Sequence, residues 1–228
     1  MKYYKSQTIH FLVEGKTNLT DCVRISFGHA VKAGLKTLVM FTGTGEGLEL
    51  ACTKYLNSPE YSAINVVGVS FPYGVMPPAA LQIPNDRLKL IQEFKIPIIR
   101  ASSPFEDLVI PQRTGASFVR RTLETFSGGM ALCVQAILVA CDAGLVRPGE
   151  HLVSMCADTS ILAKAAPTSM FFSIFAIREV ICKPVIHDIS KGEILAAEIN
   201  VDAFIKRPKR IKSTANLPLP MPDKVEEK

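Results

Sequence analysis

Residues 36–50 read Lys36-Thr-Leu-Val-Met-Phe-Thr-Gly-Thr-Gly-Glu-Gly-Leu-Glu-Leu50 and carry the clearest structural signal in this chain. Residues 37–41 are a short run of β-branched and apolar side chains, which is typical of a strand buried on both faces. Glycines end this run, and apolar side chains at helical spacing follow from Leu48 onward. The sequence therefore predicts a strand, a glycine turn and a helix in direct succession.

This succession predicts an anion site, because the unpaired N–H groups of a helix's first turn would point past the carboxyl end of the strand. The turn is not a P-loop, since no Gly-Lys-Ser/Thr follows it. It also departs from the dinucleotide fingerprint, since the third glycine falls one residue early, at Gly47. An ordinary tight turn, in which Thr42 or Thr44 caps the helix, is the open alternative.

Strand and helix patterns alternate along the rest of the chain, which predicts an α/β domain. A short turn at residues 157–160 makes the last two strands an antiparallel hairpin, so we expect a mixed sheet. Residues 9–13 read as an edge strand or an arm, and residues 193–204 as a final helix. Five strands are predicted, at 37–41, 64–71, 96–101, 151–156 and 161–165.

A long helical pattern from residue 117 to residue 145 is interrupted by Ser127-Gly-Gly. Adjacent glycines are costly inside a helix, so we expect a break there, with Ser127 capping a second helix. The glycine pair either offers N–H groups to an anion or lets the helices pack closely. We favour close packing.

The composition is that of a folded protein: the 228 residues are 48% hydrophobic, enough for a sizeable core. No long apolar run or signal-peptide pattern appears, so we expect a cytoplasmic protein that makes no membrane contact. The six cysteines include no C-x-x-C pair, which predicts buried free thiols. The four histidines lie far apart, so we expect no metal site.

Much of the net charge of +5 lies near the C-terminus. We expect residues 1–205 to form one domain with an N-terminal arm, and residues 206–228 to be a flexible tail. A basic, proline-containing tail either contacts nucleic acid through its phosphates or is simply solvated, and we favour solvation. The basic residues that crowd the start of the tail are Lys206, Arg207, Lys209, Arg210 and Lys212.

Several motifs resemble the stand-alone prokaryotic relatives of the pyruvate kinase C-terminal domain, over roughly residues 18–184. The resemblance implies a three-layer α/β/α fold whose five-stranded sheet has the order 3-2-1-4-5, with strand 5 antiparallel. The motifs are Thr44-Gly-Glu, Thr122-Leu-Glu-Thr-Phe-Ser-Gly-Gly, Cys133, Asp142-Ala-Gly-Leu, Ala157-Asp-Thr, Phe171-Phe172 and Ile177-Arg-Glu-Val-Ile-Cys-Lys-Pro.

The resemblance also implies a ligand. In pyruvate kinase this domain holds the phosphates of a sugar effector on the turn after its first strand, and flavin mononucleotide (FMN) is a further phosphorylated ligand that the resemblance suggests. With the implied strand order the chain reverses direction between strands 1 and 4, where open α/β sheets bind ligands. The site residues we expect there are Thr42, Gly43, Thr44, Gly45, Glu46, Tyr73, Cys156, Asp158 and Thr159.

No catalytic set emerges from the sequence. Cys156 is either a nucleophile or, more commonly for such a position, a buried thiol. Asp158 either orients a ligand hydroxyl or shapes the turn by bonding to its own backbone. We therefore expect a protein that binds a small phosphorylated ligand and forms a homo-oligomer. The alternatives are an enzyme whose chemistry a flavin supplies, and an oligomerising module whose tail contacts nucleic acid.

Overall fold

The computed structural model describes residues 5–72, 82–102, 104–105 and 115–185. All of them belong to the first of the two units into which the chain divides, Met1–Ile186. Tyr73, the helix expected at 193–204 and the tail at 206–228 lie outside the described residues. In the described part, no helix combines the length and the apolar character needed to cross a membrane.

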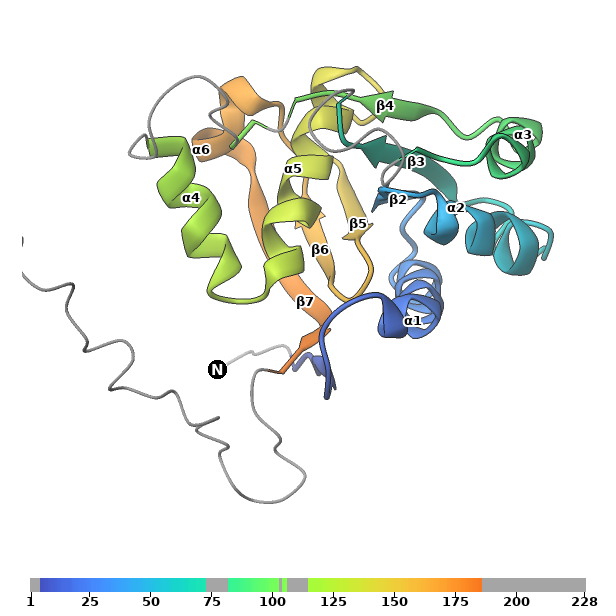
Figure 1. The fold of residues 1–228 in the computed structure, drawn as a ribbon. Helices are drawn as coiled ribbons and strands as arrows, with labels where there is room; N and C mark the ends of the chain where they lie inside the picture. The colour runs from blue at the N-terminus through green and yellow to red at the C-terminus, as the bar shows by residue number, and fades with distance from the viewer. Residues whose placement is uncertain (1–4, 73–81, 103, 106–114, 186–228) are drawn as a thin grey trace, which may run out of the picture. The chain divides into compact units, whose positions relative to one another are not determined.

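The fold is α/β and is built on one mixed sheet of seven strands (Figure 1), in the order β1-β7-β6-β5-β2-β3-β4. The pairs β5–β2, β2–β3 and β3–β4 are parallel, and so is β1–β7, whereas β6 is antiparallel to both β5 and β7. The strands are β1 (Ile9–Phe11), β2 (Thr37–Phe41), β3 (Asn65–Ser70), β4 (Ile98–Arg100), β5 (His151–Met155), β6 (Ser160–Lys164) and β7 (Ala176–Pro184).

The predicted five-stranded sheet is wrong in its number of strands. Two further strands extend the sheet: β7 pairs with β6, and β1 forms the edge beyond β7. The five strands predicted from the sequence lie next to one another in the order β4-β3-β2-β5-β6, and β6 is the antiparallel member. Of the two alternatives for residues 9–13, the structure shows the edge strand, at Ile9–Phe11.

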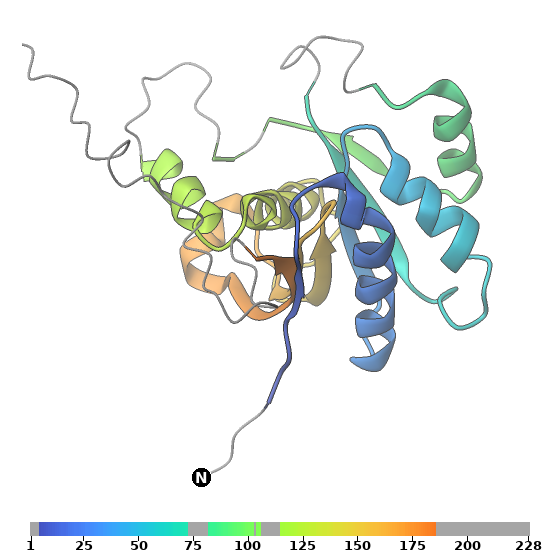
Figure 2. The same ribbon diagram turned by 60° about the horizontal axis from the view of Figure 1, so that its bottom comes forward.

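Helices cover both faces of the sheet: α1, α2 and α3 lie on one side and α4 and α5 on the other (Figures 1 and 2). A π-helix at Ala51–Tyr55 continues α2 directly. Two 3₁₀ turns, Lys16–Asn18 and Thr168–Met170, precede α1 and α6. The α-helices are α1 (Leu19–Lys32), α2 (Glu46–Leu50), α3 (Asn85–Glu93), α4 (Gly115–Glu124), α5 (Gly128–Asp142) and α6 (Phe171–Ile174).

The position of β2 between two layers of helices explains why its side chains are almost all apolar. Leu38 and Met40 are buried in the core under α1, whereas Val39 is buried in the core under α5. Successive side chains of a strand point to opposite faces, so a strand covered on both faces has no polar side. Helix α5 is likewise buried along most of its length, because it lies between the sheet and α4.

The predicted break before α5 is confirmed. Ser127 is extended, with φ −173° and ψ 154°, and its side chain accepts a hydrogen bond from the Met130 N–H. The N–O distance is 3.1 Å. Ser127 therefore caps α5 and fixes the point at which this helix starts, at its lower end in Figure 1.

Candidate functional site

A cavity of about 370 Å³ lies at the carboxyl ends of β2, β3 and β5. Strand β2 lies between β3, the next strand along the chain, and β5, which follows much later, so the strand order reverses at β2. Open α/β sheets bind their ligands at such a point. The cavity is lined by Glu14, Gly15, Phe41, Gly43, Phe71, Gly128, Gly129, Leu132, Cys156, Ala157 and Asp158.

Of the five residues predicted from the turn after β2, Gly43 is the one that lines the cavity. Thr42 is buried, and its Oγ1 accepts a hydrogen bond of 2.9 Å from the Gly45 N–H. The carbonyl oxygen of Thr44 accepts a hydrogen bond of 2.6 Å from Nη1 of Arg87. Other groups of the protein thus already bond to some of the hydrogen-bonding groups of the turn that we expected to hold a ligand.

Gly45 and Glu46 lie against residues from other segments of the chain. Gly45 is left-handed, with φ +78°, and a Cβ added there would lie 2.8 Å from Ile83 and 2.9 Å from Arg87. Glu46 forms an ion pair of 2.6 Å with Lys16. These two residues therefore join the turn to α3 and to the segment before α1, whereas Gly43 remains available to a ligand.

The opposite wall is the turn between β5 and β6, where Cys156 and Asp158 line the cavity. Asp158 is 8% exposed, and its Oδ2 accepts a hydrogen bond of 2.7 Å from the Gly15 N–H. Its Oδ1 accepts a hydrogen bond of 3.0 Å from the Thr159 hydroxyl. Thr159 is fully buried and also bonds to Ser127 at 2.8 Å, so it supports the wall from behind.

The first turn of α5 closes the cavity between these walls. Gly128 and Gly129 both line it, and the first-turn N–H groups of a helix have no acceptor within that helix. In the part of the chain that the structure describes, no other acceptor is found for these two N–H groups. The positive end of the α5 dipole therefore faces the cavity.

Gly129 is closely packed, but against the β5–β6 turn and not against another helix, as the favoured interpretation of Ser127-Gly-Gly had it. A Cβ at this position would lie 2.5 Å from both Cys156 Sγ and Thr159 Oγ1, closer than atoms can approach. Only glycine lets α5 lie this near to the β5–β6 turn. At Gly128, in contrast, an added Cβ would have no neighbour within 4 Å. Packing therefore requires glycine at position 129 but not at position 128.

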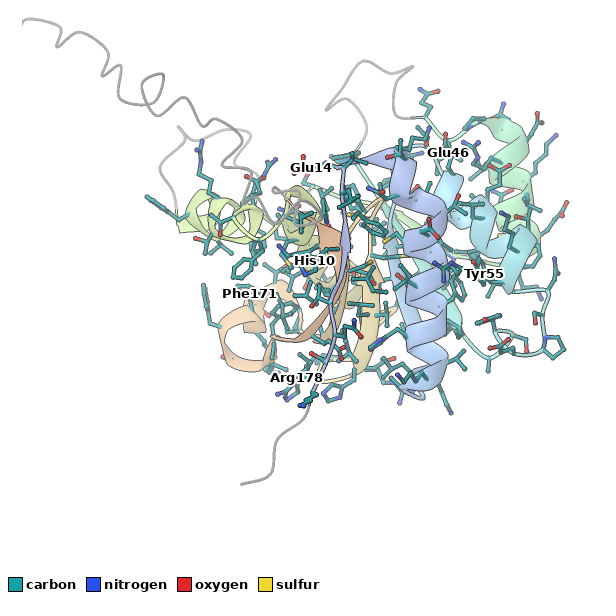
Figure 3. All side chains as sticks on the ribbon, turned by 90° about the horizontal axis from the view of Figure 1, so that it is seen from below. His10, Glu14, Glu46, Tyr55, Phe171 and Arg178 are labelled. Carbon is teal, nitrogen blue, oxygen red and sulfur yellow. The ribbon has the colours of Figure 1, made fainter. Side chains whose placement is uncertain are left out.

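The charges around the cavity are unusual for a phosphate site. Its described lining includes the carboxylates of Glu14 and Asp158 and no lysine or arginine. Lys16 lies close by, but it is paired with Glu46, and Figure 3 shows Glu14 and Glu46 at the same end of the molecule. Positive potential in the cavity must therefore come mainly from backbone N–H groups.

One side of the cavity is apolar, with Phe41, Phe71 and Leu132 in its wall. The two phenylalanine rings meet edge to face, with centroids 4.8 Å apart. An aromatic pair of this kind offers a surface for a flat apolar group. The cavity thus combines an N–H end, a carboxylate region and an aromatic wall.

Cys156 is the one thiol in this lining. Its Sγ lies 3.7 Å from Asp158 Oδ1 and 3.8 Å from the Gly129 carbonyl oxygen. A hydrogen bond from the Cys133 thiol lowers the pKa of Cys156, against the opposing effect of burial. Among the described residues no histidine lines the cavity, and no group of acidic, cysteine or histidine side chains could hold a metal ion.

No protein-family model matches this chain. The resemblance to relatives of the pyruvate kinase C-terminal domain therefore stays a prediction from the sequence motifs.

We expect Gly129→Ala to destabilise the protein by about 1–3 kcal/mol, because the added methyl group overpacks the contact with Cys156 and Thr159. Gly128→Ala is the matched control. It should leave stability unchanged or raise it slightly, since its Cβ meets open space and alanine favours a helix. Urea unfolding followed by circular dichroism measures both changes. Equal stability of the two variants would contradict the contact.

We expect Cys156 to react with iodoacetamide faster than Cys141 at about pH 8. The two thiols are similarly buried, at 4% and 6% exposed. The pKa of Cys156 is lowered, whereas burial raises that of Cys141 to about 11, so Cys156 has far more thiolate at this pH. Mass spectrometry of the alkylated peptides gives the two rates, with Cys156→Ser identifying the peptide. A faster reaction at Cys141 would argue against this assignment.

Proposed function

We propose that this protein binds a small phosphorylated ligand, FMN or a sugar phosphate, in the cavity between β2 and β5. One observation carries the proposal: glycines from two distant parts of the chain, Gly43 and Gly128–Gly129, line the same cavity. Glycine lets a ligand approach the backbone closely, and the first turn of α5 supplies N–H donors. These groups would hold the phosphate.

The carboxylates and the aromatic wall of the cavity favour a ligand that has hydroxyl groups and a ring in addition to a phosphate. Carboxylates accept hydrogen bonds from hydroxyl groups, and Glu14 and Asp158 would face the sugar or the sugar-alcohol chain. Phe41 and Phe71 would contact a flat ring. FMN has all three parts in this order: phosphate, hydroxylated chain and aromatic ring. A sugar phosphate has the first two.

The proposed function is binding. The described cavity wall offers one thiol and two carboxylates. Asp158 Oδ1 lies 3.7 Å from the Cys156 thiol, but a carboxylate is a weaker base than an imidazole, and Asp158 already accepts hydrogen bonds from Gly15 and Thr159. Any reaction at this site would therefore depend on chemistry that the ligand supplies, as a flavin does. In that case the protein residues would bind the flavin, orient it and exclude water around it.

The purified protein tests the choice between the two ligands. If FMN is bound, the protein should absorb at about 450 nm and release a flavin on denaturation. If the ligand is a sugar phosphate, the protein should be colourless, and ribose 5-phosphate should raise its melting temperature. Added FMN and ribose 5-phosphate both leaving the melting temperature of colourless protein unchanged would overturn the proposal.

Gly128→Pro tests the N–H donors directly. Proline is well tolerated at the first position of a helix, and Ser127 already has the extended conformation that a following proline requires. The variant loses one N–H group at the cavity, and we expect affinity for the phosphorylated ligand to fall about 10-fold or more. Isothermal titration calorimetry measures the change.

Gly128→Ala is the control for that variant, because it keeps the N–H group and its Cβ meets open space. We expect it to bind with nearly the affinity of the unmodified protein. Equal affinity of the proline and alanine variants would show that the Gly128 N–H does not contact the ligand.

A further inference from the structure

A much smaller cavity of about 10 Å³ lies next to the cavity of the candidate site. Phe41 and Phe71 line both cavities, so the two are adjacent at these side chains. Helix α5 also runs past both: Leu132 lines the larger cavity, and Gln135 and Val139 line the smaller one. Residues three and four apart share one face of a helix, so the two cavities follow a single face of α5.

Ser70 gives the small cavity an unusual chemical character. This residue ends β3 and is 1% exposed, yet its Oγ has no hydrogen-bond partner among the residues that the structure describes. Other buried serines in the described part are bonded, for example Ser154 to the Cys133 carbonyl and Ser26 to the Cys22 carbonyl. Buried polar side chains are nearly always paired with protein or with ordered water, and an unpaired one needs an explanation, such as a bound water or a polar ligand atom.

A second polar side chain lies at the same place. Gln135, which is 3% exposed, lines the small cavity together with Ser70. The remainder of this lining is apolar: Phe41, Val69, Phe71, Pro72, Ala101 and Val139. A hydroxyl and an amide in an otherwise apolar cavity are the arrangement by which proteins recognise a polar atom at the edge of a ring.

We propose that Ser70, with Gln135, binds the polar edge of a ring carried by the ligand. The inference rests on the proposed function, because the ring must enter from the larger cavity. The small cavity has room for about one water-sized atom, so it would take a single ring oxygen or nitrogen. The Ser70 hydroxyl donates to that atom, while the body of the ring lies against Phe41 and Phe71.

This subsite narrows the class of ligand. A sugar phosphate has no flat ring whose edge carries a hydrogen-bond acceptor, so it would leave Ser70 without a partner. A heteroaromatic mononucleotide, including FMN, has both a phosphate for the N–H end and a ring edge with carbonyl oxygens and ring nitrogens. The unpaired hydroxyl therefore favours the mononucleotide over the sugar phosphate.

Ser70→Ala tests the subsite with two probes, FMN and ribose 5-phosphate. We expect the variant to bind FMN about 10-fold more weakly than the unmodified protein, because one ring hydrogen bond is lost. Its affinity for ribose 5-phosphate, which has no such ring, should not change. Without ligand, its melting temperature should be equal or higher, since the native hydroxyl has no partner to lose.

Ser154→Ala is the matched control. It removes a buried hydroxyl from β5, which β2 separates from β3 in the sheet. This hydroxyl is bonded within the protein, and Ser154 lies outside both cavities. We expect it to lower the melting temperature and to leave FMN affinity unchanged. This opposite pattern separates a binding role of a serine from a structural one.

Three results would overturn the subsite. Unchanged FMN affinity in Ser70→Ala would leave the proposed function intact while removing this inference. A melting temperature lowered as much as in Ser154→Ala would show that the Ser70 hydroxyl is bonded inside the protein. If the unmodified protein binds ribose 5-phosphate but not FMN, only the subsite is overturned. If it binds neither probe, the proposed function is overturned together with the subsite.

Discussion

The close contact between the first turn of α5 and the β5–β6 turn positions everything around the cavity. It exists because Gly129 has no side chain, and a Cβ there would overlap Cys156 and Thr159. From this contact a line of hydrogen bonds runs outward: Ser127 to Thr159, Thr159 to Asp158, and Gly15 to Asp158. These bonds hold α5, the hairpin and the N-terminal segment around one space, which is why residues from three distant regions share its wall.

The same arrangement explains the electrostatic character of the site. Asp158 uses both carboxylate oxygens on protein donors, so its charge is partly balanced before any ligand arrives. The donors left for an anion are backbone N–H groups at Gly43 and in the first turn of α5, because Lys16 is paired with Glu46. Under the proposed function, such a site would select its ligand by shape and hydrogen-bond direction more than by net charge.

The central sheet could be predicted because its strands are self-evident in the sequence. Runs such as residues 37–41 are apolar on both faces and are bounded by glycine or proline, and the short turn at residues 157–160 forces an antiparallel hairpin. Strand β7 was not predicted, and residues 9–13 were left open between an edge strand and an arm, because neither segment has these signals. Strand β1 has three residues, and β7 pairs with β6 through register shifts that break the regular alternation of buried and exposed side chains.

The sequence by itself determined the α/β class, the central strands, the start of α5 at Ser127 and the turns after β2 and β5, because each depends on local residue pattern. Which turn residues face the cavity was decided only by the tertiary structure. Thr44, Gly45 and Glu46 meet Arg87, Ile83 and Lys16, and Phe71 and Glu14 reach the cavity from other elements. These contacts join segments far apart in the chain, so no local pattern encodes them.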